Sequence, residues 1–319
     1  MKVQNHISRE FRVNRGLRQG DSLSCLLFNL TLERVIRNIE INRGGTLLNR
    51  TIHYLAYADD VDLLSRNAGA LKESFIQLEE ASEQAGLVVN EDKTKYMIME
   101  RKVKNAREPL EVNQHKFERV DHFKYLGSLV TENNETHLEV MSRISAGNRC
   151  YFSMQHLLKS RLLSRRLKKT IYRVVIRPVV TYGSETWVLT KRDEDALNTW
   201  ERKILRKIYG PVQDDGQWRS RMNAELYELY EDPAISTEVR KGRLRWAGHM
   251  ERMQEDRGVR KAFRQNPGGR RLPGRPRKRW LDDVEEDLRR LGVRGWRRRA
   301  LDRDGWREVV EEARALQGL

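Results

Sequence analysis

Cysteine is scarce in this sequence: only Cys25 and Cys150 occur among its 319 residues. Two cysteines are too few for a disulfide scaffold or a four-cysteine zinc site, and so low a number fits a reducing compartment. Long apolar runs are also missing, since none approaches the roughly 20 residues that cross a bilayer. Residues 1–20 carry five basic residues and no apolar core, so a secretory signal peptide is not expected.

Acidic residues are outnumbered. The chain has 62 Lys and Arg against 46 Asp and Glu, which gives a formal net charge of +16 at pH 7. Seven Trp, ten Tyr and seven Phe argue against disorder throughout, and the length allows two or three domains that each bury a core. This charge predicts an internal polyanion as partner, with nucleic acid first and a membrane surface a poor second.

Residues 1–130 have the pattern of a mixed α+β region. Apolar residues at helical spacing predict helices over 23–39 and 71–85, and Gly86 is a candidate C-terminal cap for the second. Apolar runs on either side of Ala58-Asp59-Asp60 predict a β-hairpin with two adjacent acids at its tip. Further short strands are expected at 87–90, 95–99 and 123–130. This order predicts an antiparallel sheet with helices on one face.

Residues 131–210 form the second expected region, which is largely helical and interrupted at Pro178 and Gly183. Within it, residues 159–177 hold eight basic residues and no acid beside an apolar side. We expect one helix there that buries one face and offers charge to phosphates, although a solvated helix face is the alternative. Its candidate nucleic-acid-binding residues are Lys159, Arg161, Arg165, Arg166, Lys168 and Lys169.

Residues 211–319 form a third, basic region. Residues 257–280 contain ten Lys and Arg, no acid and several Pro and Gly, a composition that predicts an extended basic loop. Helices are expected over 280–291 and 306–316. The candidate nucleic-acid-binding residues of the loop are Arg275, Arg277, Lys278 and Arg279.

Asp59 and Asp60 are the most informative local feature. Two carboxylates at a tight turn repel each other and have no basic neighbour in sequence, an arrangement that makes sense if divalent cations lie between them. A solvated acidic turn is the alternative. Asp62 could add charge on the same side of the strand, but we expect it to face solvent.

The surroundings of this pair resemble the reverse transcriptases of non-LTR retrotransposons, particularly RTE- and jockey-like elements. Residues 15–24 (RGLRQGDSLS) are similar to motif B, and Tyr57-Ala58-Asp59-Asp60 matches motif C. Residues 86–95 (GLVVNEDKTK) resemble motif D, and residues 123–128 (FKYLGS) resemble motif E, the primer grip. The four motifs occur in the family's order and at its spacing.

The resemblance implies an incomplete polymerase palm followed by a helical thumb and a basic C-terminal region. In the family, two Mg²⁺ or Mn²⁺ ions serve nucleotide addition on an RNA template and a DNA primer or target, and Asp59 and Asp60 would hold them here. Lys93, or else Lys95, would protonate the leaving pyrophosphate, unless both are surface lysines. The same resemblance implies that the residues contacting the nucleotide or template are Gln19, Gly20, Tyr57 and Ala58. It implies that the primer grip consists of Phe123, Lys124, Tyr125, Leu126 and Gly127.

In the family a third metal-binding carboxylate comes from motif A, which precedes motif B. Here only residues 1–14 precede the motif B turn, and Glu10 is their only acid. We therefore expect a truncated region without motif A, the fingers or the upstream endonuclease, with little or no polymerase activity alone. A sheet without the motif A strand is expected to expose an edge and an apolar helix face.

The alternative is a catalytically silent RNA- or DNA-binding protein derived from a retroelement. Basic charge and retroelement ancestry together point to the nucleus or to a cytoplasmic ribonucleoprotein. Residues 243–250 (RLRWAGHM) and 274–283 (GRPRKRWLDD) also resemble the C-terminal region of these elements. We expect Trp187, Trp200 and Trp246 to be core anchors rather than base-stacking platforms, and His249 to be packed or hydrogen-bonded.

Overall fold

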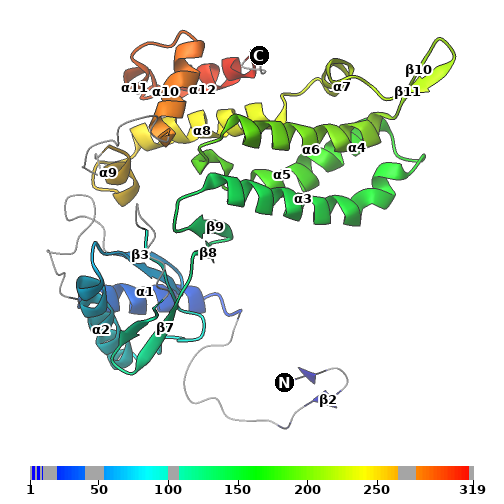
Figure 1. Ribbon diagram of the computed structural model, residues 1–319. Coiled ribbons are helices and arrows are strands. Elements are labelled where there is room, and N and C mark those ends of the chain that lie inside the picture. Colours follow the sequence, from blue (N-terminus) through cyan, green and yellow to red (C-terminus); the bar gives the residue numbers. More distant parts are fainter. Residues whose placement is uncertain are drawn as a thin grey trace. The chain divides into compact units, whose positions relative to one another are not determined.

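The computed structural model describes residues 2–3, 6–7, 9, 20–39, 54–99, 108–264 and 278–315. These residues form helices and small sheets, which confirms the predicted α+β class (Figure 1). The chain divides into two compact units, residues 1–95 with 109–118 and residues 96–108 with 119–319. Within the described ranges, no helix combines the length and apolar character needed to cross a bilayer.

The first unit contains two helices and short strands. In chain order they are β1 (Lys2–Val3), β2 (His6–Ile7), α1 (Ser24–Arg37), β3 (Tyr54–Tyr57), β4 (Asp60–Leu63), α2 (Ala68–Gln84), β5 (Lys95–Tyr96), β6 (Leu110–Val112) and β7 (His115–Arg119). Asn67 caps α2 because its side chain accepts a hydrogen bond from the backbone N–H of Ala70 at 2.8 Å. Phe75 of α2 packs edge-on against Phe117, with ring centroids 4.9 Å apart. Both predicted helices of this region are confirmed.

The predicted sheet is smaller than expected. Among the described residues, β3 pairs with β4 alone, and a separate three-stranded sheet has the order β5-β7-β6. The strand predicted at 87–90 is wrong, because Asn90 accepts hydrogen bonds from the backbone of Lys93 and Thr94 and so forms a local turn. The strand expected at 95–99 is limited to β5. Gly86 has φ +74°, as expected for the residue that follows a helix end.

The second unit begins with a hairpin and continues as helices. Its elements from His122 to Arg252 are, in chain order, β8 (His122–Tyr125), β9 (Ser128–Thr131), α3 (Thr136–Lys159), α4 (Arg165–Ile171), the π-helix η1 (Tyr172–Ile176), α5 (Arg177–Thr181), the 3-10 helix η2 (Ser184–Thr186), α6 (Lys191–Tyr209), β10 (Val212–Asp214), β11 (Gln217–Arg219), α7 (Asn223–Tyr230) and α8 (Ile235–Arg252). The strand expected over 123–130 is thus a hairpin.

One apolar core holds α3, α6, α7 and the first half of α8 together. Its largest side chains include Trp200, Tyr172 and Tyr230, and Trp187 is also buried, which confirms two of the three tryptophans predicted as core anchors. The Glu201 carboxylate is fully buried in this core and accepts hydrogen bonds from the hydroxyl of Tyr172 at 2.7 Å and the backbone N–H of Ile235 at 2.9 Å. Burial raises the pKa of Glu201 despite these bonds.

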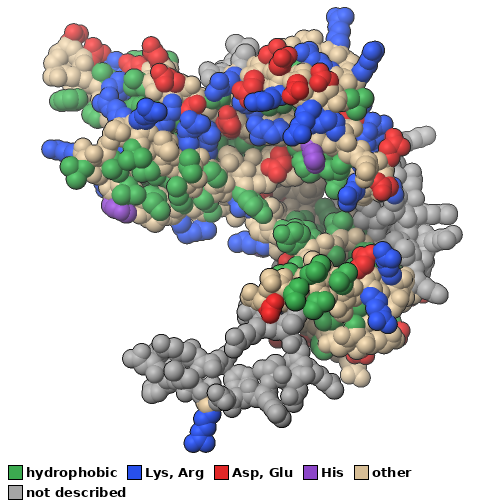
Figure 2. Space-filling view, turned by 180° about the vertical axis from the view of Figure 1, so that it is seen from behind, with side chains coloured by type: hydrophobic (Ala, Val, Ile, Leu, Met, Phe, Trp, Pro, Cys, Tyr) green, Lys and Arg blue, Asp and Glu red, His purple; other side chains and the backbone are tan. Residues whose placement is uncertain are grey.

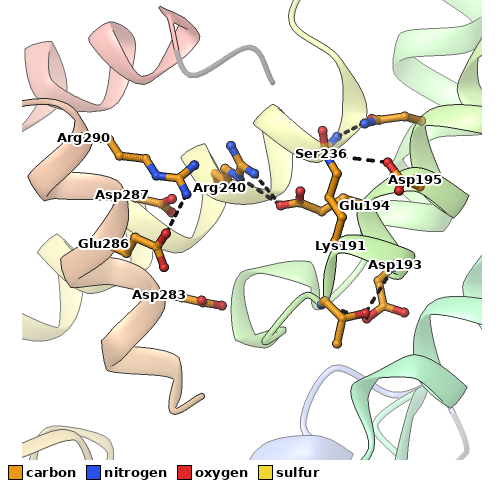
Figure 3. A network of polar contacts seen from close by, with 12 residues as sticks. Lys191, Asp193, Glu194, Asp195, Ser236, Arg240, Asp283, Glu286, Asp287 and Arg290 are labelled. Atoms are coloured by element: carbon orange, nitrogen blue, oxygen red, sulfur yellow. Dashed lines mark hydrogen bonds and ion pairs between the residues drawn. The ribbon is translucent and has the colours of Figure 1, made fainter. Parts of the chain in front are cut away.

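Polar contacts also join α6 to α8. Arg240 of α8 pairs with Glu194 of α6 at 2.5 Å, next to the capping box formed by Thr190 and Asp193 at the start of α6 (Figure 3). His137 of α3 lies 2.6 Å from the buried Asp193 carboxylate. Hydrogen bonds from Thr190 and His137 lower the pKa of Asp193, outweighing the effect of its burial.

The helix predicted over 159–177 begins late. Residues 160–164 are not helical, because α3 ends at Lys159 and the Ser164 side chain caps α4 by accepting a hydrogen bond from the backbone N–H of Leu167. From Arg165 onward the helical path runs through η1 into α5. Lys159 and Arg161 therefore do not share a helix with Arg165.

A second core lies in the C-terminal part of the second unit. It is built from the second half of α8, α9 (Gly258–Arg264), α10 (Trp280–Arg290), α11 (Trp296–Arg299), α12 (Arg303–Glu312) and the 3-10 helix η3 (Ala313–Ala315). Trp306 is 2% exposed and donates a hydrogen bond from its indole N–H to the carbonyl of Leu244 at 3.0 Å. The helices predicted near 280–291 and 306–316 are confirmed as α10 and α12.

The loop expected over 257–280 is partly wrong, because α9 occupies 258–264. Arg260 anchors this helix: it is buried and donates to the Met250 carbonyl and, at 3.1 Å, to the Glu251 carboxylate. Phe263 packs edge-on against Trp280, with ring centroids 6.0 Å apart. Residues 265–277, with Arg275 and Arg277, lie outside the described residues.

Candidate functional site: an acidic hairpin and a clamped turn

The tip of the β3–β4 hairpin carries the predicted carboxylates. Tyr57 pairs with Asp60, so Ala58 and Asp59 alone form the loop. Ala58 has φ +52°, a left-handed conformation that costs an L-residue about 1–2 kcal/mol. Two-residue hairpin loops that begin with positive φ normally have Gly, Asn or Asp there. The turn that presents the acids is therefore locally strained, a feature that is common at functional sites.

The two carboxylates are open to a ligand. Asp59 and Asp60 are both exposed, and in the described ranges no Lys or Arg forms an ion pair with either. Tyr57 beside them is 65% exposed. Asp62 is half-buried rather than solvent-facing, which corrects the expectation for this residue. Burial first, and repulsion from Asp60 second, raise the pKa of Asp62 to about 6.

The donor set of the turn fits part of a Mg²⁺ site. Carboxylate oxygens are ligands that Mg²⁺ prefers, and those of Asp59 and Asp60 are not taken up by cationic side chains. Among the described residues no cluster of three or more His, Cys, Asp or Glu is arranged to hold a metal. The hairpin therefore offers two carboxylate ligands and needs further oxygen ligands from elsewhere.

The raised pKa of Asp62 predicts a pH-dependent stability of the first unit. In the unfolded chain this carboxyl ionises near 3.8, whereas in the fold it ionises near 6, so stability should fall as pH rises from about 4 to 6. Asp62→Asn should remove this fall and stabilise the unit at pH 7 by on the order of 1 kcal/mol, a value reduced because half of the side chain meets solvent.

Thermal unfolding at pH 4.5 and pH 7, followed by circular dichroism, measures this difference. The exposed Asp92, in a turn of the same unit, gives the matched control Asp92→Asn, which should retain the pH dependence of the wild type. A wild-type stability that rises over this pH interval, or an unchanged profile in Asp62→Asn, would contradict the assignment.

Motifs B and D lie in the same unit as the acidic hairpin. Gly20 has φ +92°, which supports the predicted turn, while Gln19 lies outside the described residues. After this turn, α1 exposes a row of leucines, in agreement with the expected open helix face: Leu23, Leu26, Leu27 and Leu30. Lys95 pairs with Glu118 at 2.8 Å, whereas Lys93 is exposed and has no ion pair in the described part of the chain.

The motif E hairpin, in the second unit, has a turn with two left-handed residues. Leu126 has φ +46° and Gly127 φ +82°, the pattern of a type I′ hairpin turn. Leucine rarely adopts such a conformation, and two hydrogen bonds from outside the hairpin stabilise the turn. The Tyr182 hydroxyl donates to the Leu126 carbonyl at 2.9 Å, and the Arg143 guanidinium donates to the Gly127 carbonyl.

Helix α3 supplies the support for this turn. Arg143 lies over the Tyr182 ring, with its guanidinium carbon 4.6 Å from the ring centroid. Glu139 is 5% exposed; its carboxylate accepts hydrogen bonds from Arg143 at 2.7 Å and from the backbone N–H of Leu129 at 2.8 Å. These contacts fix the hairpin relative to α3 and α5. No role was expected for Glu139 and Arg143 from the sequence, although their i, i+4 spacing is a signal for an ion pair on a helix.

The remaining primer-grip candidates, Phe123, Lys124 and Tyr125, lie on β8, whose exposure alternates along the strand. Lys124 is exposed, while Phe123 and Tyr125 are half-buried. The structure thus places all five primer-grip candidates on one clamped hairpin. The motif C and motif D candidates lie together in the first unit.

The predicted basic residues differ in what they contact. Lys169 is engaged by Asp232 at 3.1 Å, and Lys278 by Asp283 at 3.2 Å, so both stabilise the fold. Other candidates are exposed and have no ion pair within the described residues: Lys159, Arg161, Arg165, Arg166 and Arg279. Figure 2 shows Lys and Arg side chains interspersed with Asp and Glu over the second unit, above a group of hydrophobic side chains.

Comparison with known proteins shows what the first part of the chain is similar to. A family model described as reverse transcriptase (RNA-dependent DNA polymerase) matches residues 1–130. The chain is 23% identical over 274 residues to an uncharacterized transposon-derived protein of Caenorhabditis elegans, a match that covers 82% of this chain and 96% of the relative.

Two retrovirus-related Pol polyproteins are also similar. The polyprotein from the type-1 retrotransposable element R2 of Nasonia vitripennis is 32% identical over 136 residues, and that from the type-2 element R2 of Drosophila melanogaster is 30% identical over 128 residues. The matches cover 40% and 38% of this chain, but only 13% and 12% of the polyproteins. Over residues 1–130, the chain is therefore similar to reverse transcriptases of the non-LTR retrotransposon type.

Proposed function

We propose that this chain carries the motif C turn, primer grip and thumb-like helices of an RNA-directed DNA polymerase that copies RNA onto a DNA primer or target. The observation that carries the proposal is the strained hairpin tip inside the region matched by the family model, where Asp59 and Asp60 have no cationic partner among the described residues. In this reading, residues 1–130 form part of a palm, 131–210 a thumb and 211–319 a basic C-terminal region. Sequence resemblance favours RTE- and jockey-like elements within the family.

The residues have distinct roles in nucleotide addition. Asp59 and Asp60 would hold two Mg²⁺ ions, which would supply charge stabilisation for the oxygens of the in-line displacement. Lys93 supplies a proton to the leaving pyrophosphate. The backbone at Gly20, without a side chain, allows close approach of the nucleotide or template, and Tyr57 and Ala58 border it. The clamped Leu126-Gly127 turn positions the primer end.

The 319 residues supply two of the family's three metal-binding carboxylates. Loss of one such ligand costs several kcal/mol of transition-state stabilisation, a factor of roughly 10³ or more in rate. We therefore expect little or no synthesis in a primer-extension assay with Mg²⁺ or Mn²⁺ on an RNA template. Asp59→Ala/Asp60→Ala is the control. Template-dependent synthesis that this double variant loses would contradict the expected inactivity and support the catalytic role of the pair.

A second candidate function is a catalytically silent RNA- or DNA-binding protein that acts in the nucleus or in a cytoplasmic ribonucleoprotein. The exposed, unpaired basic residues of α4, among them Arg165 and Arg166, favour it. Binding that weakens steeply with salt, without synthesis by any variant, would support this function over polymerisation.

A further inference from the structure

A groove of about 1040 Å³ lies between α8 and α12 in the second unit. Besides the buried Trp306, six basic or aromatic residues line it: Arg245, Trp246, His249, Arg252, Arg303 and Arg307. Arg245, Trp246 and His249 lie in the stretch 243–250 that resembles the C-terminal region of non-LTR retrotransposons, for which a grip on RNA or target DNA is the natural expectation, but none of the six is among the named candidate nucleic-acid-binding residues. The groove therefore adds a surface that is separate from the acidic hairpin and from the basic segment of α4.

Helical spacing explains why these residues meet. Arg245, His249 and Arg252 follow one another at i, i+4 and i+7 along α8, and Arg303 and Arg307 are four residues apart on α12. The other side of α8 faces the core, where Leu244 and Gly248 pack under Trp306. The groove residues therefore form the outward faces of two helices that share one core.

Three arginines of the groove have no carboxylate partner among the described residues. Arg245, Arg303 and Arg307 are exposed and form no ion pair within the described residues, whereas Arg243 and Arg260 nearby are buried against carboxylates. Arg252 donates to the Ala300 carbonyl at 2.6 Å, and burial together with repulsion from Arg303 lowers its pKa. Two neighbouring guanidinium groups that repel each other and form no ion pair among the described residues, such as those of Arg252 and Arg303, favour an anion between them.

Three acids also border the groove: Glu185, Asp304 and Glu311. Lys241 holds the Glu311 carboxylate at 3.1 Å, and this contact is the largest cause of the lowered pKa of Glu311. Glu311 is therefore already matched by a cation. Four arginines then face the two remaining acids, so the lining keeps a positive balance.

An aromatic surface lies beside the arginines. The rings of Trp246 and His249 are 5.3 Å apart and inclined by 32°. Trp246 is half-buried and His249 exposed, in contrast to the packed positions expected from the sequence. Single-stranded nucleic acids bind where arginines contact phosphates and an aromatic ring stacks on a base.

We infer that the groove between α8 and α12 binds single-stranded nucleic acid, with Arg303 and Arg307 contacting phosphates and Trp246 stacking on a base. The inference rests on the proposed nucleic-acid function and assigns it a specific surface. Since duplex bases are stacked on one another, an unpaired strand should bind more tightly than the corresponding duplex.

Fluorescence anisotropy with labelled oligo(dT) and oligo(U) of about 15 nucleotides tests the groove in the full chain. Arg303→Gln/Arg307→Gln should weaken binding about tenfold or more and reduce the slope of log affinity against log salt by about 1.4, because each phosphate contact contributes about 0.7. Trp246→Leu should weaken binding about fivefold or more, while Trp246→Phe should retain most of the affinity.

Lys203→Gln/Lys207→Gln is the matched control, because these lysines are exposed, four residues apart on α6 and outside the groove. It should change the affinity less than about threefold. Suppose the wild type binds, but the arginine variant has the affinity of the wild type or of the lysine variant. In that case the groove is not the binding site, while the proposed function stands. If the wild type binds neither oligonucleotide, both fail.

Discussion

Arg243→Met is expected to destabilise the second unit by about 3–5 kcal/mol, because it removes the cation from a buried ion cluster. Arg243 is 3% exposed and donates to Asp283 at 2.9 Å and to Asp287 at 2.5 Å. Both carboxylates lie on one side of α10 (Figure 3). Without the guanidinium, two buried negative charges would face each other, and only Asp283 would keep a cation, Lys278 at 3.2 Å.

Urea denaturation followed by tryptophan fluorescence measures this loss. Arg245→Met, two residues along the same helix, removes an exposed arginine without an ion pair and should change stability by less than about 0.5 kcal/mol. Adding Asp283→Asn and Asp287→Asn to Arg243→Met should restore much of the stability, since no buried charge then remains unpaired. A single Arg243→Met variant as stable as the wild type would show that the cluster is not formed.

Gly248→Ala is expected to destabilise the same unit by about 2 kcal/mol or more, because there is no space for a methyl group at this position. A Cβ built at Gly248 would lie 2.1 Å from the indole nitrogen of Trp306. That indole is buried and bonded to the Leu244 carbonyl, so it cannot move without losing a hydrogen bond. The change would also separate α8 from α12 and thereby open the groove.

Gly242→Ala on the same helix is the matched control. A Cβ at this position would meet only the Cβ of Glu185, at 3.9 Å. Since Ala is favoured over Gly in a helix interior, this variant should be as stable as the wild type or more stable by up to about 1 kcal/mol. Thermal unfolding of the two variants compares them directly; a melting temperature of Gly248→Ala equal to that of Gly242→Ala would disprove the close packing.

Local patterns were sufficient for the elements nearest to the candidate site. Two apolar runs that flank a pair of acids can pair only as a hairpin, and the register leaves Asp59 and Asp60 at its tip. The sequence did not predict α9, because this helix depends on the contact of Arg260 with Glu251, a carboxylate of the preceding helix. It also did not predict the clamp on the Leu126-Gly127 turn, whose partners lie up to 56 residues away.

The amino-acid sequence alone was sufficient for the similarity of residues 1–130 to reverse transcriptases, the positions of the paired acids and most helices, because these depend on neighbouring residues and on local periodicity. Which basic residues stay available to a ligand depends instead on how the helices pack. Arg243 and Arg245 are two residues apart on α8, yet one is buried between carboxylates of α10 and the other is exposed in the groove. A helix with basic residues on several faces has no local signal for which face is buried; only the packing of α10 and α12 on α8 determines it.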